Sequence, residues 1–362
     1  MKSNRMFAIA LSVLGTTAVL SLGQAPAPAP LRTGPGVQAS QDAKEADLLA
    51  TCKTPAPPAR GGRGPGGAAG RGRGPAAPTG PKEYTVTEIP GVIASGQKWK
   101  DIWQVSGNNA DGIIGTRDGG LLIAQNDNSN VMKLDKNGKV SVAYSGTNTG
   151  GAVSMNTKGV LFLNNRGLNE EIVELAPQRK TFANKYLGDP LDCIRTGVLN
   201  DLTADSKGGA YFTFGGLYYA DPKGVVTKYG ENLNTNGIIL SRDEKTLYVT
   251  NGPTLAAFDV QPDGSLTNQR EFAKWESGGG DGSTIDAEGR IYVSTTPGVQ
   301  VISPEGKFLG LIPTPQNIIS LAFSGKDKKT LFAVVSLRDA NGQSARIISI
   351  PMIAQGYKGR AK

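Results

Sequence analysis

Four Asp or Asn residues stand at the same position of four copies of one repeated hairpin: Asp111, Asn200, Asn236 and Asp281. Each opens a short apolar strand, which is followed by a turn and a second apolar strand, as in DGIIGTRDGGLLIAQ and DGSTIDAEGRIYVST. Two carboxylates and two amide carbonyls supply oxygen ligands with a formal charge of −2, and such ligands suit a hard divalent cation such as Ca²⁺. The pattern therefore predicts an oxygen-rich metal site formed by these four residues.

The alternative interpretation is turn chemistry, because Asx before Gly is common in turns and one such pair carries little functional information. A pure turn requirement would place Asx at the start of every copy. The copy from Gly151 has none, and the copy from Asn317 lacks the Gly or Asp that follows elsewhere. This uneven distribution favours a metal site, and the turn interpretation stays open beside it.

The repeat predicts the fold that positions these residues. Six copies start at residues 111, 151, 200, 236, 281 and 317, with spacings of 40, 49, 36, 45 and 36 residues. That period is typical of propeller blades. We expect an all-β, six-bladed β-propeller of four-stranded antiparallel blades, with the Asx residues converging at the mouth of a central tunnel. The strand at 345–353 is expected to pair with segment 83–93 and so to close the ring from both chain ends.

The N-terminal region predicts export. Residues 1–25 combine two basic residues, an apolar stretch and small residues, as a secretory signal peptide does, and this signal would be removed without leaving a transmembrane anchor. Residues 26–82 are rich in Pro, Gly, Ala and Arg and predict a disordered linker, with a marginal helical turn at 41–52. The propeller is expected over 83–362, and the protein in the periplasm or outside the cell.

The positive charge of the chain is concentrated in this linker. Residues 1–82 carry ten Lys/Arg and three Asp/Glu, whereas the remainder carries 29 and 28. We therefore expect no nucleic-acid partner for the folded domain. The two cysteines, Cys52 and Cys193, permit a disulfide in an exported chain. Such a bond would tie the linker to the propeller. The oligomeric state has no sequence signal.

The absence of histidine restricts the chemistry. It excludes Ser-His-Asp catalysis and His-ligated zinc, and it leaves oxygen ligands and carboxylates. Asp201, beside Asn200, is one candidate general base. Its alternative role is structural, as a residue hydrogen-bonded to the backbone.

Three hairpins, LNDLTADSKGGAYFT, TNGIILSRDEKTLYVT and GDGSTIDAEGRIYVST, resemble the signature hairpins of the senescence-marker-protein/gluconolactonase (regucalcin-like) family over about residues 100–352. The resemblance implies a six-bladed propeller with a divalent metal, Ca²⁺ first and Zn²⁺, Mg²⁺ or Mn²⁺ as alternatives. It implies Asn236 and Asp281 as direct ligands, Asn200 beside metal and substrate, and Asp281 as the base that takes a proton from water. The family's Glu ligand aligns with Asp111, and its substrate-binding Arg aligns with Val198.

These features together predict a metal-dependent hydrolase that opens a small-molecule lactone or ester. The bound cation would polarise the carbonyl and help to ionise a water molecule, with Asp281 and Asp201 as candidate catalytic residues. One alternative is a non-catalytic propeller that binds a ligand or protein and holds a structural metal, because the propeller fold hosts many functions. Another is a phosphotriesterase like diisopropyl fluorophosphatase, which would be separated by its activity on organophosphates.

Overall fold

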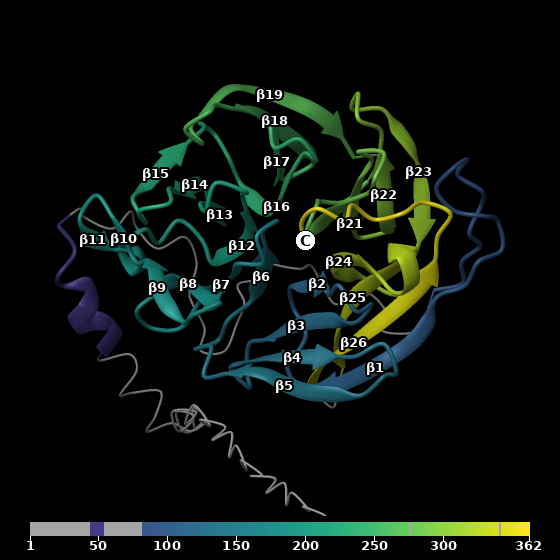
Figure 1. Cartoon of the computed structure of the whole chain (residues 1–362), viewed down its shortest axis with the longest axis horizontal. Helices are drawn as coiled ribbons and strands as arrows, with labels where there is room; N and C mark the ends of the chain where they lie inside the picture. The colour runs from purple at the N-terminus through teal and green to yellow at the C-terminus, as the bar shows by residue number, and fades with distance from the viewer. Residues whose placement is uncertain (1–43, 54–81, 276, 340–341) are drawn as a thin grey trace, which may run out of the picture.

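Six four-stranded antiparallel sheets surround a common axis in the computed structural model, which describes residues 44–53, 82–275, 277–339 and 342–362 (Figure 1). The all-β six-bladed propeller predicted from the repeat is confirmed. In five blades the four strands follow one another in sequence from the axis outward. Contacts between β2 and β6, β6 and β12, β12 and β16, β16 and β20, and β20 and β24 connect the inner strands around the ring, and β24 also contacts β2.

The five consecutive blades are built from short strands, as the turn spacing predicts. The first two blades comprise β2(Ile113–Gly115), β3(Leu121–Gln125), β4(Asn130–Leu134) and β5(Val140–Ser145), then β6(Ala152–Met155), β7(Leu161–Asn165), β8(Glu171–Ala176) and β9(Lys180–Ala183). The next three comprise β12(Leu199–Ala204), β13(Ala210–Phe214), β14(Leu217–Ala220) and β15(Val226–Tyr229), then β16(Thr235–Leu240), β17(Thr246–Asn251), β18(Thr254–Val260) and β19(Leu266–Lys274), then β20(Ser283–Ile285), β21(Ile291–Thr295), β22(Gly298–Ile302) and β23(Phe308–Pro313).

The sixth blade is closed by both chain ends, but not by the N-terminal segment that the sequence indicated. Its strands are β24(Ile318–Ser324), β25(Thr330–Asp339) and β26(Gly342–Pro351), with β1(Lys100–Ser106) paired outside β26. Segment 83–93 was expected in that position. It forms an isolated β-bridge between Ile89 and Ile93, and the Val92 oxygen accepts the backbone N–H groups of Ile353 and Ala354, at 3.0 and 3.1 Å. Its apolar side chains are buried in the core beside this blade.

Short irregular elements complete the described chain. Between the second and third blades lie the two-stranded β10(Lys185–Tyr186) and β11(Asp189–Pro190) and the 3₁₀ turn η1(Leu191–Cys193). A second 3₁₀ turn, η2(Lys326–Lys328), joins β24 to β25.

An Asp holds the turn after each of two inner strands. Asp205, after β12, accepts the backbone N–H groups of Gly208 and Gly209, each at 2.7 Å, and its Oδ2 accepts the Tyr219 hydroxyl at 2.8 Å. Asp286, after β20, likewise accepts the Tyr292 hydroxyl at 2.8 Å. An Asp side chain that accepts backbone N–H groups shapes a turn without help from another strand, so Asp205 and Asp286 fix where the second strand begins in these two blades.

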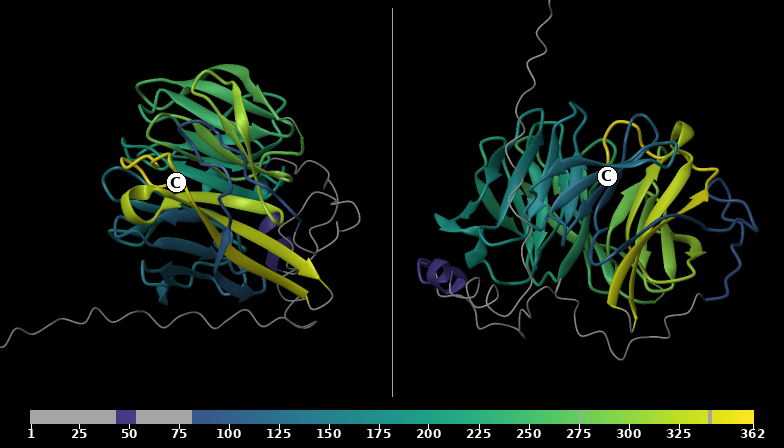
Figure 2. Two further views of the ribbon diagram at one scale, coloured as in Figure 1. Left: turned by 90° about the vertical axis from the view of Figure 1, so that its right-hand side faces the viewer. Right: turned by 90° about the horizontal axis from the view of Figure 1, so that it is seen from below.

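A segment of the predicted linker is attached to the propeller. Residues 44–49 form a short helix beside the propeller (Figure 2). Cys52 forms a disulfide with Cys193. The backbone N–H of Lys53 donates to both carboxylate oxygens of Asp189, at 3.0 and 3.1 Å. The disulfide that the sequence permitted is therefore present, and the helix at residues 44–49 lies within the segment 41–52 for which the sequence allowed a helical turn. The remaining linker and the predicted signal peptide lie outside the described residues. None of the described helices is long and apolar enough to span a membrane.

Candidate functional site

The four predicted site residues lie at one end of the propeller axis. Asp111 lies two positions before β2, Asn200 and Asn236 are the second residues of β12 and β16, and Asp281 lies two positions before β20. All four are partly buried. We call this end of the axis, where the inner strands begin, the Asx face. The four residues that share a repeat position therefore lie together where the inner strands begin.

The glycine that follows the Asx residue has a packing role at three of these positions. A Cβ added to Gly112 would lie 2.8 Å from the carbonyl oxygen of Gly151, and one added to Gly237 would lie 2.1 Å from that of Asp281. At Gly282 the corresponding distance, to the Ile319 oxygen, is 2.8 Å. Real Cβ atoms do not approach so closely, so glycine lets neighbouring inner strands meet near the axis. Close strand packing thus explains the glycine of the Asx-Gly signature.

Arg166, which the sequence argument did not single out, joins the Asx residues. It follows β7, and its Nη1 lies 2.5 Å from the Oδ2 of Asp111. Its Nη2 donates to the backbone oxygen of Asn200 at 2.5 Å and to its Oδ1 at 3.2 Å. The Asn200 amide in turn donates to the Oδ1 of Asn236 at 2.8 Å. One chain of hydrogen bonds therefore runs from Asp111 through Arg166 to Asn236.

These contacts do not fit a divalent ion held by all four predicted oxygen ligands. Asp111 Oδ2 accepts from Arg166 and, at 2.9 Å, from Asn126, while Asn200 and Asn236 each have their Oδ1 engaged by a protein donor. Across the described parts of the chain, no three Asp, Glu or Cys side chains gather so as to hold a metal ion. A cation at Asp111 would have to displace a guanidinium of like charge, which is unfavourable.

Asp201 has a structural environment. Its Oδ1 accepts the backbone N–H of Leu202 at 2.9 Å, and its Oδ2 accepts that of Ile238 at 3.0 Å. Oδ2 is also paired with the ammonium of Lys362. A carboxylate with both oxygens engaged is poorly placed to accept a proton from water, so the geometry favours the backbone-bonded role that the sequence left open.

Lys362 reaches Asp201 because the C-terminal segment lies near the axis (Figure 1) and contacts the last residues of inner strands, at the end opposite the Asx face. Ala361 forms a bridge with Met155, the last residue of β6, and Arg360 donates to the oxygen of Leu240, the last residue of β16, at 2.5 Å. Burial lowers the pKa of the Lys362 ammonium, and the charges of Asp201 and Asp281 oppose that shift. The segment thus places a positive charge inside the propeller, below the Asx face.

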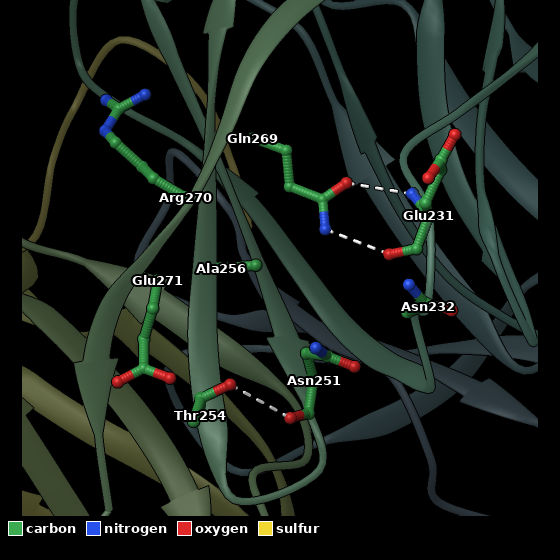
Figure 3. A pocket seen from close by; sticks show the side chains of 8 residues that line it. All are labelled: Glu231, Asn232, Asn251, Thr254, Ala256, Gln269, Arg270 and Glu271. Carbon is green, nitrogen blue, oxygen red and sulfur yellow. Dashed lines mark hydrogen bonds between the residues drawn. The ribbon is translucent and has the colours of Figure 1, made fainter.

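A hollow of about 580 Å³ lies elsewhere, over the outer strands of the fourth blade (Figure 3). Gln269 spans it by hydrogen bonds to the backbone of Glu231, at 2.9 and 3.0 Å. Its other lining residues are polar or small: Asn232, Asn251, Thr254, Ala256, Arg270 and Glu271. None of the predicted site residues lines it, so it does not serve the chemistry of the Asx face.

The residues that sequence reasoning missed at the Asx face are Arg166 and Asn126. Neither lies in the repeated Asx position, and each follows a second strand, β7 or β3. One signal did point to Arg166, namely the missing Asx at Gly151. A Cβ on Gly151 would lie 1.8 Å from the guanidinium carbon of Arg166. The position that carries Asx in other copies is here left empty for an arginine.

The fold and the Asx face define a class of protein, the six-bladed propellers with a polar site where their inner strands begin. The model of the SMP-30/gluconolactonase/LRE-like region matches residues 124–337, which is more than half of the chain. The chain therefore belongs to the SMP-30/gluconolactonase family, as its hairpins indicated.

Similar curated proteins include lactonases. A gluconolactonase of Zymomonas mobilis is 28% identical over 240 residues, covering 58% of this chain and 61% of that protein. Lactonase drp35 of Staphylococcus epidermidis is 32% identical over 189 residues, covering 46% of this chain and 50% of that protein. The chain therefore matches between half and three fifths of the length of these relatives.

Solved structures show the same fold. A gluconolactonase of Xanthomonas campestris aligns with a TM-score of 0.62 at 21% identity, covering 77% of this chain and 98% of that one. A calcium-binding protein, regucalcin, of Agrobacterium tumefaciens aligns with a TM-score of 0.57 at 18% identity, covering 70% and 95%. At these identities the likeness supports the propeller architecture alone.

Proposed function

We propose that the chain is a hydrolase that opens a lactone or ester at the Asx face. The observation that carries the proposal is the convergence of Asp111, Asn200, Asn236 and Asp281 at one end of the axis, in a chain whose relatives include a gluconolactonase and lactonases. The names of those relatives suggest lactones as the substrate class. The disulfide between Cys52 and Cys193 supports a site of action outside the cytoplasm, in the periplasm or beyond.

Asp281 is the proposed general base. In the reaction, a water oxygen attacks the carbonyl carbon, its proton passes to the Asp281 carboxylate, and the bond between the carbonyl carbon and the ring oxygen breaks. The proton then passes from Asp281 to the alkoxide that leaves. Arg166, fixed at the same face, and Lys362, below it, supply positive potential that favours the developing negative charge on the carbonyl oxygen. No step is assigned to the divalent cation predicted from the sequence, because Asp111 is held by Arg166 and Asn126.

The test is whether the full chain hydrolyses glucono-δ-lactone, aliphatic γ- and δ-lactones and aryl esters. Hydrolysis is measured as the release of protons at constant pH. Asp281→Asn should reduce kcat by at least about 100-fold, since positioned base catalysis contributes on that order, and it should leave the melting temperature close to that of the wild type. Asp135→Asn is the matched control. Asp135 accepts backbone N–H groups of Asn137 and Lys139 in an exposed turn of the first blade, so its variant should keep full activity.

Hydrolysis by the wild type that survives Asp281→Asn unchanged would disprove the role of Asp281. No hydrolysis of any lactone or ester, by a folded wild type, would instead support the alternative of a non-catalytic binding propeller. One observation favours that alternative, namely that the second candidate base, Asp201, has both oxygens engaged by backbone N–H groups.

A further inference from the structure

Arg166 is held by acceptors on every side. Its Nε donates to the oxygen of Leu199 at 2.7 Å. Nη1 donates to Asp111 and, at 3.2 Å, to the Oδ1 of Asn126, and Nη2 donates twice to Asn200. A guanidinium has five N–H groups in a fixed planar fork, and five acceptor contacts surround this one. The side chain is only 9% exposed. It is therefore a fixed part of the Asx face.

The chain leaves room for this guanidinium at one position. Gly151 occupies the place that carries Asx in the five other copies, and a Cβ there would lie 2.0 Å from Nη1 and 2.3 Å from Nε of Arg166. The backbone N–H of Gly151 donates to the side-chain oxygen of Asn164 at 3.0 Å. The missing Asx and the buried arginine are thus one feature, because either a side chain at residue 151 or the guanidinium can occupy this space.

We infer that Arg166 is a built-in cation that takes the place of a divalent metal ion at Asp111 and Asn200. The Asx face of this chain then carries its positive charge on a side chain and does not bind a divalent ion through those residues. The inference departs from the metal site predicted from the sequence. It does not depend on the proposed hydrolase, because it is tested by metal binding.

The charges around the axis agree with this inference. Three carboxylates, Asp111, Asp201 and Asp281, give −3, and two cations of the chain, Arg166 and Lys362, give +2. These five charges sum to −1, so an added dication would reverse the sign of the net charge near the axis. A dication beside Asp111 would also lie next to a guanidinium that is always charged, and two like charges in a partly buried site disfavour each other.

Arg166 acts as a positioning residue in this arrangement. All its N–H groups are directed at protein acceptors, so it holds Asp111 and Asn200 in place and contributes charge, without binding a substrate directly. A metal ion could be removed by a chelator, whereas this cation cannot. The Asx face should therefore keep its geometry in the presence of EDTA.

Metal content of the full chain gives the first test. The protein is dialysed against Ca²⁺, Zn²⁺, Mg²⁺ or Mn²⁺ in turn, and bound metal is measured by mass spectrometry together with the melting temperature. The expected result is less than about 0.1 ion per chain and no change in melting temperature, since a ligand stabilises only the state that binds it. One ion per chain that is lost in Asp111→Asn or Asp281→Asn would overturn the inference.

Arg166→Met gives the second test, because it removes the charge and frees the oxygens of Asp111 and Asn200. Ca²⁺ affinity, measured by calorimetry, should rise at least about tenfold over the wild type, with a melting temperature that increases with Ca²⁺ concentration. Arg166→Lys should stay close to the wild type, because the positive charge remains. Arg179→Met is the matched control. Arg179 lies on the same blade, exposed, and donates to the backbone of Ser145 and Gly146.

The inference is also overturned if Arg166→Met folds and still binds no Ca²⁺, because another feature would then exclude the ion. If this variant does not fold, Gly151→Ala replaces it, since the added Cβ forces the guanidinium away from Asp111 without changing the net charge. Its Ca²⁺ affinity should rise in the same direction but by less than in Arg166→Met, and an affinity equal to that of the wild type counts against the inference.

Discussion

The pair formed by Asp201 and Lys362 should respond very differently to removal of its two members. Lys362→Met leaves the Asp201 carboxylate with the backbone N–H groups of Leu202 and Ile238 at 2.9 and 3.0 Å, so its charge stays hydrogen-bonded. We expect this variant to lose only about 2 kcal/mol of unfolding free energy, the net value of one hydrogen bond to a charged group. Asp201→Asn leaves the Lys362 ammonium buried beside an amide. The ammonium still donates to the backbone oxygen of Leu202, at 2.8 Å.

Breaking a buried ion pair in this way costs about 3–5 kcal/mol. The substitution at Asp201 also turns an NH₂ group toward one of the two backbone N–H donors, which adds to the loss. The C-terminal segment can limit this cost by leaving the axis, which would bring Lys362 into water. In that case the global loss is smaller, and the amides of Gly356 and Ala361, bonded to Lys328 and Met155, lose their protection from hydrogen exchange.

The assay is urea denaturation of the full chain at pH 7, because urea does not screen charge, with hydrogen exchange of the C-terminal amides measured in parallel. Asp135→Asn, in an exposed turn, is the control and should change neither measurement. The reasoning is refuted if Lys362→Met costs as much as Asp201→Asn, or if Asp201→Asn changes neither the unfolding free energy nor the exchange of Gly356 and Ala361.

Two further predictions concern the ends of the propeller. Cys52→Ser opens a loop closed across 141 residues. The loop-entropy relation gives a loss of unfolding free energy of up to about 5 kcal/mol, or about 8 °C in melting temperature for a domain of this size. A loss below about 1 kcal/mol would show that the disulfide does not stabilise the protein by closing this loop. Burial lowers the pKa of Lys328 to about 8, with the charges of Arg360 and Lys358 as further causes. The unfolded chain then binds more protons than the folded protein between pH 8 and 10.5. The unfolding free energy should therefore rise with pH across that window, by about 3 kcal/mol in total. Lys328→Met should remove this slope, and equal slopes in the two proteins would contradict the assignment of the slope to Lys328.

The fold could be predicted to a large extent because the signal was repeated. Six copies of one hairpin fix the number of blades, and closure by both chain ends follows from the need to avoid a free edge. The N-terminal strand itself was assigned wrongly, to 83–93 in place of Lys100–Ser106. In β1 only Trp103 and Val105 are partly buried, in alternation with exposed residues. Val86, Ile89 and Val92 are fully buried and carry the stronger apolar pattern, although they pack into a core without pairing as a strand.

The site was predictable where residues share a repeat position and was missed where they do not. The convergence of Asn200 and Asn236, now seen as a 2.8 Å hydrogen bond, follows from register alone. Arg166 comes from the end of a second strand, and its contact with Asp111 spans 55 residues of sequence. Such a contact depends on how two neighbouring blades pack against each other near the axis, and periodicity along the chain carries no information about it.

The Asx-Gly signature combines two requirements that sequence alone does not separate. The glycine at residues 112, 237 and 282 is needed because the next inner strand lies within 3 Å of where its Cβ would be. Strand packing does not restrict the Asx residue before this glycine in the same way. A polar side chain is needed there for another reason, namely the hydrogen bonds that it makes at the Asx face. Gly151 unites the two effects, because the atoms that would contact its Cβ belong to the guanidinium of Arg166. Where a propeller repeat of this kind lacks its Asx, the space near the axis is available to a side chain from a neighbouring strand, and the charge of that side chain then decides whether a cation can bind beside it.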